Sequence, residues 1–304
     1  MLWFSTRATI GIDVSDHVIR AVEVTHARTQ SRITRFAEVA VPPGAIIHGD
    51  ILRDEQVHDA LHTLLRHHFD IEHATAVVSL PESHAFLKTI LLQNGDLLEN
   101  ELPKHLPFPV TDVIFDSLSH GTIDRDGVSA FVTSFAAIPK HIAEQYADVM
   151  AKARLHCRAL EVESQAIARL YAPTQTPEQV VVLVDLGKNH STVIMIAEGR
   201  IDVTHASLEI TAASHEKLGA EIQRVVRFHT EHGPKTASVK DYTISLTGGG
   251  SQIPGLVEQL KKETQLPVSV ATLPNTIRIP AQLRETVFSY NTAIGLAMRE
   301  YFPL

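Results

Sequence analysis

Two stretches of this chain repeat one pattern, and this repeat constrains the fold more than any single motif does. Residues 10–15 read IGIDVS, and residues 182–187 read VLVDLG. Each stretch is an apolar strand that ends in an aspartate, Asp13 or Asp185, before a polar turn and a second apolar strand. Such a pattern, met twice in 304 residues, indicates a duplication. We therefore predict two similar α/β domains that face each other across a cleft.

The rest of the chain alternates between strand and helix signals. The expected strands are 8–13, 19–24, 33–41, 76–80, 180–185, 192–196, 240–246 and 268–271. The expected helices are one capped by Asp54, with apolar positions Val57, Leu61, Leu64 and Leu65, and further ones at 212–231, 254–264 and 289–301. Strands and helices in this order are typical of α/β domains.

Residues 83–153 differ from both halves. They predict a strand at 85–92, a short acidic helix at 97–102, a hairpin turn at 124–127 and a helix at 141–153. We interpret them as a small α+β subdomain inserted in the first domain. The expected boundaries are 1–160 for the first domain, 161–285 for the second, and 286–304 for a C-terminal helix that packs back on the first.

Charge and cysteine content exclude several classes of protein. The formal net charge is −8 and no Lys/Arg-rich run is present, which argues against nucleic-acid binding. The single cysteine, Cys157, has no partner for an internal disulfide, so we expect a reducing compartment. No apolar stretch reaches the about 18 residues of a membrane span. The apolar start, residues 1–4, lacks the basic residues of a signal peptide, and we expect it to pack or form a strand.

The repeated aspartates are candidate ligands for a hydrated divalent cation. Mg²⁺ prefers oxygen ligands, keeps several waters and usually lies beside phosphates. The turns after Asp13 and Asp185 would present backbone N–H groups to those phosphates. The alternative for either aspartate alone is that it ends a strand and caps a turn. The repetition of the whole pattern favours the metal site.

A glycine-rich loop, TGGGSQIPG, follows a predicted strand and precedes a helix. Gly248, Gly249 and Gly250 allow a ligand to approach the main chain without a Cβ in the way. Ser251 is the expected N-cap and Pro254 suits the first turn, so that a helix N-terminus directly behind the loop favours anions. A flexible connection is the alternative, but two glycines would suffice for it. We predict a nucleotide contact.

Other site motifs are absent from the sequence. Ile253 stands where the dinucleotide fingerprint needs its third glycine, and the Gly-Lys pair at 187–188 lacks the Ser or Thr of a P-loop. His58 and His62 lie four residues apart without a carboxylate or cysteine at ligand spacing, which is typical of a solvated helix face.

Three of these motifs together resemble those of the actin-like ATPase superfamily. Residues 11–13 (GID), 184–187 (VDLG) and 247–251 (TGGGS) are similar to its two phosphate motifs and its adenosine motif, in that order. Residues 163–168 (ESQAIA) are similar to its connecting helix, where a glutamate, here Glu163, helps to position the attacking water. The resemblance implies two ribonuclease-H-like domains around a nucleotide cleft, with a subdomain inserted in the first.

Within the superfamily, the sequence resembles the PilM family of type IV pilus assembly proteins. The segments that carry this resemblance are 78–83 (VSLPES), 106–109 (LPFP), 162–169 (VESQAIAR), 245–256 (SLTGGGSQIPGL) and 292–297 (TAIGLA). The family implies a cytoplasmic adaptor at the inner face of the bacterial inner membrane. It would bind ATP or ADP with Mg²⁺, dock the cytoplasmic N-terminal tail of a PilN-like inner-membrane protein, contact other pilus assembly components and self-associate.

The resemblance also implies the site residues. Asp13 and Asp185 would hold Mg²⁺ through water, and Glu163 would position the water for hydrolysis. The residues expected at the nucleotide besides the two aspartates are Ser15, Arg20, Gly187, Ser191, Thr192, Glu221, Gly248, Gly249 and Gly250. The partner's tail would add an extended strand to the inserted subdomain, where Phe108, Leu87 and Ile90 either line a groove or belong to the core.

The first phosphate turn departs from the family pattern. The family reads Gly-Ser-Ser-Ser before Val-Lys, whereas residues 15–20 here read SDHV before Ile-Arg. The missing glycine adds a Cβ near phosphate, Val18 removes a hydroxyl, and Asp16 adds a negative charge whose repulsion costs on the order of a few kcal/mol if no Mg²⁺ intervenes. Arg20 keeps the basic position. We therefore expect ATP binding with weak or absent hydrolysis.

Two alternatives remain. One is a nucleotide-free, degenerate scaffold in the same machine or in a type II secretion-like machine. The other is a filament-forming cell-division actin. The second would carry a C-terminal amphipathic tail, and the type II secretion relative carries a membrane span; we expect neither here. Asp13→Ala separates the proposed adaptor from the scaffold, because only the adaptor has nucleotide binding to lose.

Overall fold

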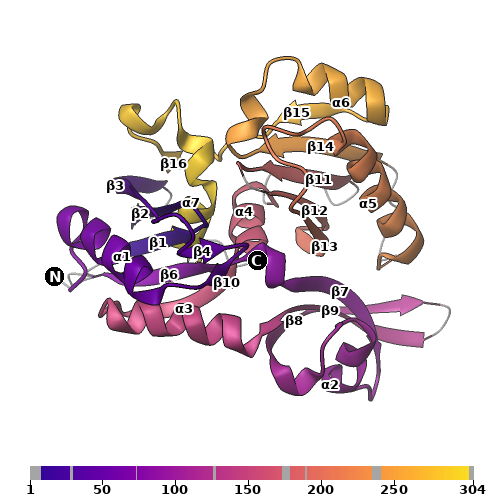
Figure 1. The fold of residues 1–304 in the computed structure, drawn as a ribbon. Coiled ribbons are helices and arrows are strands. Elements are labelled where there is room, and N and C mark those ends of the chain that lie inside the picture. Colours follow the sequence, from indigo (N-terminus) through magenta and orange to yellow (C-terminus); the bar gives the residue numbers. More distant parts are fainter. Residues whose placement is uncertain are drawn as a thin grey trace. The chain divides into compact units, whose positions relative to one another are not determined.

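The structure is a computed structural model that describes residues 8–27, 30–72, 74–125, 128–172, 179–188, 190–234 and 241–300. The apolar start of the chain, the tip of the predicted hairpin at 126–127 and Tyr301, the last residue expected to be helical, lie outside these ranges. The chain forms two compact units (Figure 1). Unit 1 comprises Met1–Ser83, His141–Pro173 and Thr272–Leu304, and unit 2 comprises His84–Lys140 and Thr174–Ala271.

Unit 1 is built on a six-stranded sheet with the order β10-β6-β1-β2-β3-β16. Its strands are β1 (Thr9–Val14), β2 (Val18–Ala27), β3 (Gln30–Ala40), β6 (Thr75–Leu80), β10 (Cys157–Val162) and β16 (Ile277–Arg278). The chain runs antiparallel from β1 through β3, while β6 and β10 run parallel to β1 on its other side. All six residues of β1 are buried, which is typical of a strand covered on both faces.

Helices and a small hairpin complete unit 1. They are α1 (Asp54–His68), α3 (Lys140–Lys152), α4 (Glu163–Tyr171), α7 (Asn291–Ala297) and the hairpin of β4 (Ile46–Ile47) and β5 (Asp50–Ile51). Helix α1 packs against β2 and β3, and α7 packs against β1, β2 and β6 beside α4. The four buried apolar residues of α1 are those that the helical period predicts.

Unit 2 contains an eight-stranded sheet with the order β15-β14-β11-β12-β13-β7-β9-β8. Its strands are β7 (Phe86–Gln93), β8 (Val113–Arg125), β9 (Val128–Pro139), β11 (Gln179–Leu186), β12 (Ser191–Ala197), β13 (Arg200–Ser207), β14 (Asp241–Thr247) and β15 (Val268–Val270). Its helices include α2 (Leu98–Glu101), α5 (Leu218–His232) and α6 (Leu256–Thr264). The apolar core between the sheet and the helices α5 and α6 contains buried residues such as Val182, Leu218 and Leu260.

The predicted duplication appears in the topology of the two sheets. The strands β10-β6-β1-β2-β3 and β15-β14-β11-β12-β13 have the same order, and in both sets three parallel strands are followed by an antiparallel meander. The repeated strands β1 and β11 occupy the same central place. Asp13 and Asp185 therefore lie at equivalent ends of equivalent strands.

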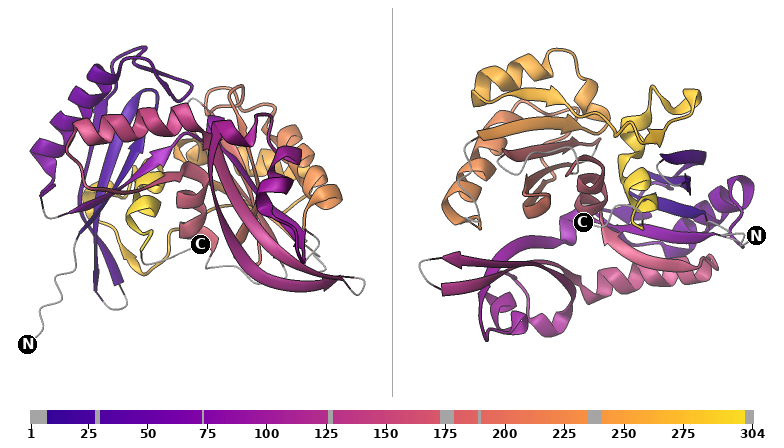
Figure 2. Two further views of the ribbon diagram at one scale, coloured as in Figure 1. Left: turned by 90° about the horizontal axis from the view of Figure 1, so that it is seen from below. Right: turned by 180° about the vertical axis from the view of Figure 1, so that it is seen from behind.

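The segment predicted as an insertion, 83–153, is divided between the units. Its strands β7, β8 and β9 and its helix α2 belong to unit 2, whereas α3 belongs to unit 1. The long β8–β9 hairpin curves around α2 (Figure 2). Residues of α2 and of the loop after it, including Leu102 and Leu106, pack on Ile90 and Phe135 of this curved sheet. Ile90 is thus part of the core, which is one of the two alternatives considered for it.

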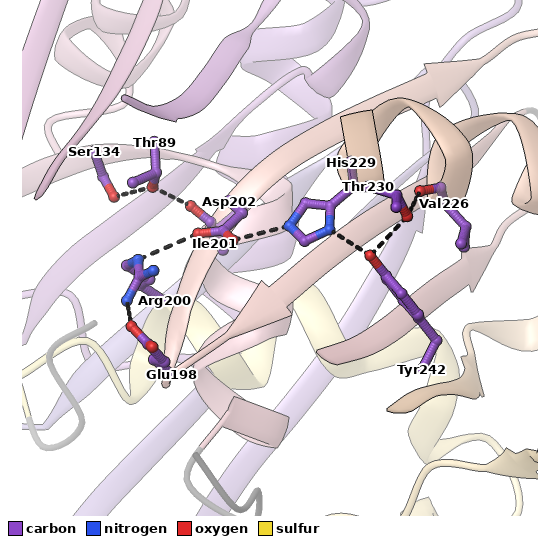
Figure 3. A network of polar contacts seen from close by, with 10 residues as sticks. All are labelled: Thr89, Ser134, Glu198, Arg200, Ile201, Asp202, Val226, His229, Thr230 and Tyr242. Carbon is purple, nitrogen blue, oxygen red and sulfur yellow. Dashed lines mark hydrogen bonds and ion pairs between the residues drawn. The ribbon is translucent and has the colours of Figure 1, made fainter. Parts of the chain in front are cut away.

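The strand β7 joins β13 of the repeated sheet through polar contacts as well as main-chain pairing. Val203 pairs with Lys88, and the Thr89 hydroxyl donates to the carbonyl of Ile201 at 2.6 Å. Thr89 Oγ1 also lies 2.6 Å from the hydroxyl of Ser134 in β9 (Figure 3). These contacts make the segment 84–140 and the second repeat one hydrogen-bonded sheet.

A buried charged network continues from β13 into α5 and β14 (Figure 3). Asp202 lies 3.2 Å from Arg200 Nε and 2.9 Å from His229 Nε2, and all three side chains are buried. His229 Nδ1 lies 3.1 Å from the hydroxyl of Tyr242, which in turn lies 2.9 Å from the hydroxyl of Thr230. The network therefore ties the edge of the repeated sheet to α5 and to the strand that leads into the glycine loop.

Several predicted helices are shorter in the structure than the sequence indicates. Helix α5 begins at Leu218 rather than at residue 212, because the N–H of Ala212 donates to the carbonyl of Gly187 at 2.8 Å and holds that residue in a turn. Helix α7 ends at Ala297, where the N–H of Met298 is shared between two carbonyls. Helix α6 begins at Leu256 rather than at residue 254. None of the described helices has the length and apolar character needed to cross a membrane.

Candidate functional site

Asp13 is the last residue but one of β1 and is buried in unit 1. The N–H of the next residue, Val14, donates to the hydroxyl of Ser79 in β6 at 2.9 Å, which fixes the end of β1 against its parallel neighbour. Across the antiparallel pair, Asp13 faces Arg20 of β2. The guanidinium of Arg20 is bonded to Glu38 at 2.9 Å and lies over the ring of Tyr290, 5.6 Å from its centroid. The predicted basic residue therefore already has a carboxylate partner.

The first phosphate turn is closed by its own residues. The N–H and the hydroxyl of Ser15 both donate to the carbonyl of Val18, at 3.1 and 2.9 Å. The carbonyl of His17 accepts from Val41 at 2.9 Å, which ties the turn to the end of β3. The carboxylate of Asp16 accepts two backbone N–H groups, those of His48 at 2.9 Å and Gly49 at 3.0 Å. The negative charge of Asp16 is thus partly balanced by hydrogen bonds to the β4–β5 turn.

Glu163 is the first residue of α4 and is buried. The N–H of the next residue, Ser164, donates to the carboxylate of Glu82 at 3.1 Å, so the start of α4 is anchored to the segment after β6. Burial raises the pKa of the Tyr146 hydroxyl in α3 well above its ordinary value, and the charges of Glu163, Asp16, Asp13 and Asp50 raise it further. Within unit 1, Asp13 and Glu163 therefore lie near the same buried tyrosine.

The glycine loop packs against the end of β11 in unit 2. Gly248 has a φ of 79°, and a Cβ at this position would lie 2.6 Å from Asp185 Oδ1. A Cβ on Gly250 would lie 2.6 Å from Cγ of Leu186. Gly248 and Gly250 are buried, whereas Gly249 is exposed. Two of the three glycines are thus required by the approach of the loop to the strand that carries Asp185.

The start of α6 differs from the prediction. Residues 249–252 form a short 3₁₀ turn, Gly255 in the left-handed conformation precedes the helix, and α6 begins at Leu256. Ser251 is not the N-cap: its hydroxyl donates to the carbonyl of Gly248 at 2.8 Å and closes the loop internally. Pro254 lies before the cap rather than in the first turn of the helix. The N-terminus of α6 therefore does not follow the glycines directly.

Three other predicted residues lie in the second phosphate turn. The N–H of Gly187 donates to the carbonyl of His190 at 3.0 Å and closes the turn between β11 and β12. Ser191 pairs with Leu186, and Thr192 with Asp185, at the start of β12. The hydroxyl of Ser191 is buried and has no hydrogen-bond partner within the part of the chain that the structure describes. Buried hydroxyls normally have a hydrogen-bond partner, so this group differs from the other hydroxyls of the predicted site.

Glu221 is engaged elsewhere in unit 2. Its carboxylate pairs with Arg224 at 2.5 Å and with His205 Nε2 at 2.7 Å. The hydrogen bond from Arg224, followed by the influence of His205, lowers the pKa of Glu221. A contact between Glu221 and a ribose stays a prediction and would require this carboxylate to share its present partners.

The structure thus groups the predicted residues by unit. Asp13, Ser15 and Glu163 belong to unit 1, and Asp185, Gly187, Ser191, Thr192 and the three glycines lie around one strand end of unit 2. No group of three or more His, Cys, Asp or Glu side chains in the described ranges is arranged to hold a metal ion. Neither Tyr146 nor the β4–β5 turn is among the residues predicted from the sequence. A His-Gly pair between two short apolar runs is a hairpin signal that points to the latter.

These observations define the class of protein: a two-domain α/β chain of the actin-like ATPase fold, with duplicated sheets and an aspartate before a polar turn at equivalent strand ends. The family model "Type IV pilus assembly protein PilM" matches residues 11–206 and 204–301, and the chain belongs to this family.

Solved structures agree with this fold. The PilM–PilN type IV pilus biogenesis complex contains a chain that is 17% identical, with a TM-score of 0.78, and the match covers 97% of this chain and 99% of that chain. MreB 5 of Spiroplasma citri bound to AMPPNP is 11% identical, with a TM-score of 0.54 over 97% and 96% of the two chains. The cytoplasmic domain of EpsL, an inner-membrane component of the Vibrio cholerae type II secretion system, is 13% identical, with a TM-score of 0.50 over 96% and 94%.

Proposed function

We propose that this protein is an adaptor of type IV pilus assembly that binds ATP or ADP with Mg²⁺ through the motifs of its two units. The observation that carries the nucleotide proposal is the close packing around the predicted second phosphate turn, which lies between β11 and β12 in unit 2. There the glycine loop approaches the strand end that bears Asp185 so closely that Gly248 leaves no room for a Cβ. The buried hydroxyl of Ser191, without a partner in the described chain, begins the neighbouring strand.

The residues present fit the chemistry of a nucleotide with magnesium. The carboxylates of Asp13 and Asp185 would hold the hydrated ion, which supplies positive charge against the phosphates. The hydroxyls of Ser191 and Thr192 and the N–H groups of the turns would bind phosphate oxygens. The exposed Gly249 would face the ribose of the nucleotide. Glu163 would orient a water, but the altered first turn and the engaged Arg20 argue for weak or absent hydrolysis.

Calorimetric titration of the purified chain with ATP, with and without Mg²⁺, tests this proposal. We expect saturable binding that depends on Mg²⁺ and that falls at least about tenfold in Asp13→Asn and Asp185→Asn, because each loses a charged ligand. The matched control is Asp59→Asn, which removes the same charge from an exposed position on α1. If the folded chain does not bind ATP at all, the nucleotide-free scaffold is the better description.

The proposed partner is the cytoplasmic N-terminal tail of a PilN-like inner-membrane protein. Membership of the PilM family and the likeness to a chain from a PilM–PilN complex support this proposal. A chain recruited in this way would lie at the inner face of the membrane. Fluorescence anisotropy with a labelled peptide of that tail tests the proposal, with a scrambled peptide as the control. Equal binding of both peptides, or of neither, would count against it.

A further inference from the structure

The turn between β4 and β5 is held by side chains from three separate elements. His48 and Gly49 form a two-residue hairpin turn in which both have positive φ, 53° and 89°. This geometry is typical of a type I′ turn, and it is unfavourable for a residue with a Cβ such as His48. A Cβ on Gly49 would lie 2.5 Å from Cβ of Pro81, so only glycine fits at the second position.

All four main-chain polar groups of these two residues are bonded to side chains. The N–H groups of His48 and Gly49 both donate to Asp16 in the first phosphate turn, at 2.9 and 3.0 Å. The carbonyl of His48 accepts from the Ser83 hydroxyl at 2.8 Å, and the carbonyl of Gly49 accepts from the Tyr146 hydroxyl at 3.1 Å. Backbone strain of this kind persists only where the surrounding structure holds it, and here four hydrogen bonds to side chains of distant segments do so.

The two outer anchors mark the points where the chain leaves and re-enters unit 1. Ser83 is the last residue of the unit before the segment 84–140, and Tyr146 lies in α3, which follows that segment. The next residue inward from Ser83, Glu82, accepts the N–H of Ser164 at the start of α4. One turn therefore connects the first phosphate turn with both ends of the segment 84–140.

We propose that Asp16 is a positioning residue that couples occupancy of the first phosphate turn to both ends of the segment 84–140 through the His48–Gly49 turn. This inference rests on the proposed binding of nucleotide. It gives the departure from the family pattern a role: the carboxylate of Asp16 is directed at two N–H donors and does not act mainly as a repulsive charge. If Asp16 positions the turn, removal of its charge weakens ATP binding. If Asp16 mainly repels the phosphates, the same change strengthens ATP binding.

Hydrogen exchange and ATP titration of the intact chain test the proposal together. Without nucleotide, Asp16→Ala is expected to raise the exchange rate of the His48 and Gly49 amides by about tenfold or more, because both lose a charge-assisted bond. In the wild-type chain, ATP with Mg²⁺ is expected to slow exchange at these amides and around Ser83 and Tyr146. In Asp16→Ala this distant protection is lost and ATP affinity falls by about three- to tenfold, because the turn is less ordered.

Two further variants make the test specific. Asp16→Asn keeps the shape and one acceptor oxygen and is expected to be intermediate in both measurements. Asp59→Asn removes a carboxylate charge from exposed α1 and is expected to leave both unchanged. Tighter ATP binding in either Asp16 variant would overturn the proposal, because it would mean that Asp16 mainly repels the phosphates. Unchanged hydrogen exchange at His48 and Gly49 would show that Asp16 does not hold the His48–Gly49 turn. If the wild-type chain binds no ATP, the proposed function and the proposed coupling are both wrong. Hydrogen exchange without nucleotide still tests separately whether Asp16 holds the His48–Gly49 turn.

Discussion

Helix α7 packs closely against β1 at Gly11 and against α4 at Gly295. We predict that a methyl group at either glycine disrupts this packing. A Cβ on Gly11 of β1 would lie 1.9 Å from the carbonyl oxygen of Ala293 in α7. A Cβ on Gly295 of α7 would lie 1.9 Å from the carbonyl oxygen of Ala166 in α4. Both obstacles are main-chain atoms, so no side-chain rotation relieves the overlap.

The size of the effect follows from the distance that α7 must move. Ordinary contacts of a Cβ begin near 3.4 Å, so each substitution requires a displacement of about 1.5 Å. Overpacking a core typically costs about 1–3 kcal/mol. Here the shift also opens contacts of Ile294 and Leu296, which are fully buried and each worth about 1.5–3 kcal/mol. We expect Gly11→Ala and Gly295→Ala each to lower the free energy of unfolding by about 3 kcal/mol or more.

Urea unfolding followed by circular dichroism measures this loss, and hydrogen exchange of β1 assigns it to unit 1. The matched control is Gly219→Ala in α5, where the atoms nearest to the new Cβ are side-chain atoms of Glu263, the carboxylate oxygen at 2.1 Å and Cβ at 3.0 Å. The carboxylate can rotate away and alanine favours a helix over glycine, so we expect a smaller loss than in either test variant. Wild-type stability in Gly11→Ala and Gly295→Ala, or an equal loss in the control, would refute the reasoning. The double variant should lose less than the sum, because one displacement relieves both clashes.

Three further predictions concern buried charges and pH. Asp202→Ala should lower the free energy of unfolding by about 3–5 kcal/mol, since it removes a carboxylate beside the buried guanidinium of Arg200 and the buried hydrogen-bond partner of His229; a loss under about 1 kcal/mol in chemical denaturation would contradict this. Arg169→Met should also be destabilising, because the buried Glu161 loses its buried guanidinium partner and keeps the more exposed Arg299 at 3.2 Å; the double variant with Glu161→Leu should recover most of the loss, as thermal unfolding would show. The pKa of Glu221 is lowered, so its ion pairs stabilise the fold fully above about pH 4.5, the ordinary pKa of a glutamate. This contribution is lost as the pH falls further. Glu221→Gln should therefore lose less stability between pH 6 and pH 3 than the wild-type chain.

Much of the fold followed from patterns within short stretches of sequence. The apolar period of α1 predicted all four of its buried apolar residues, and the repeated strand and aspartate predicted two sheets of the same strand order. Both signals are local: they depend on which face of a helix or strand a side chain occupies. The order of the motifs likewise led to the family that the comparison found.

The site depended more on the tertiary structure. The sequence indicated that Asp16 would face phosphate, but its carboxylate bonds to a turn more than thirty residues away. Gly11 belongs to a predicted phosphate motif, yet in the structure its lack of a Cβ allows α7 to pack closely against β1. Both contacts join segments far apart in the chain. No periodicity or motif in either segment alone specifies them.

The sequence by itself determined the repeat and the type of most elements, and it supplied the residues that we propose for phosphate and magnesium chemistry. Only the tertiary structure decided where α5 begins, which glycines of the loop are required by packing, and which predicted side chains already have partners. The physical reason is that main-chain and charged groups must be satisfied when they are buried, and their partners become neighbours only once the sheets and helices have assembled.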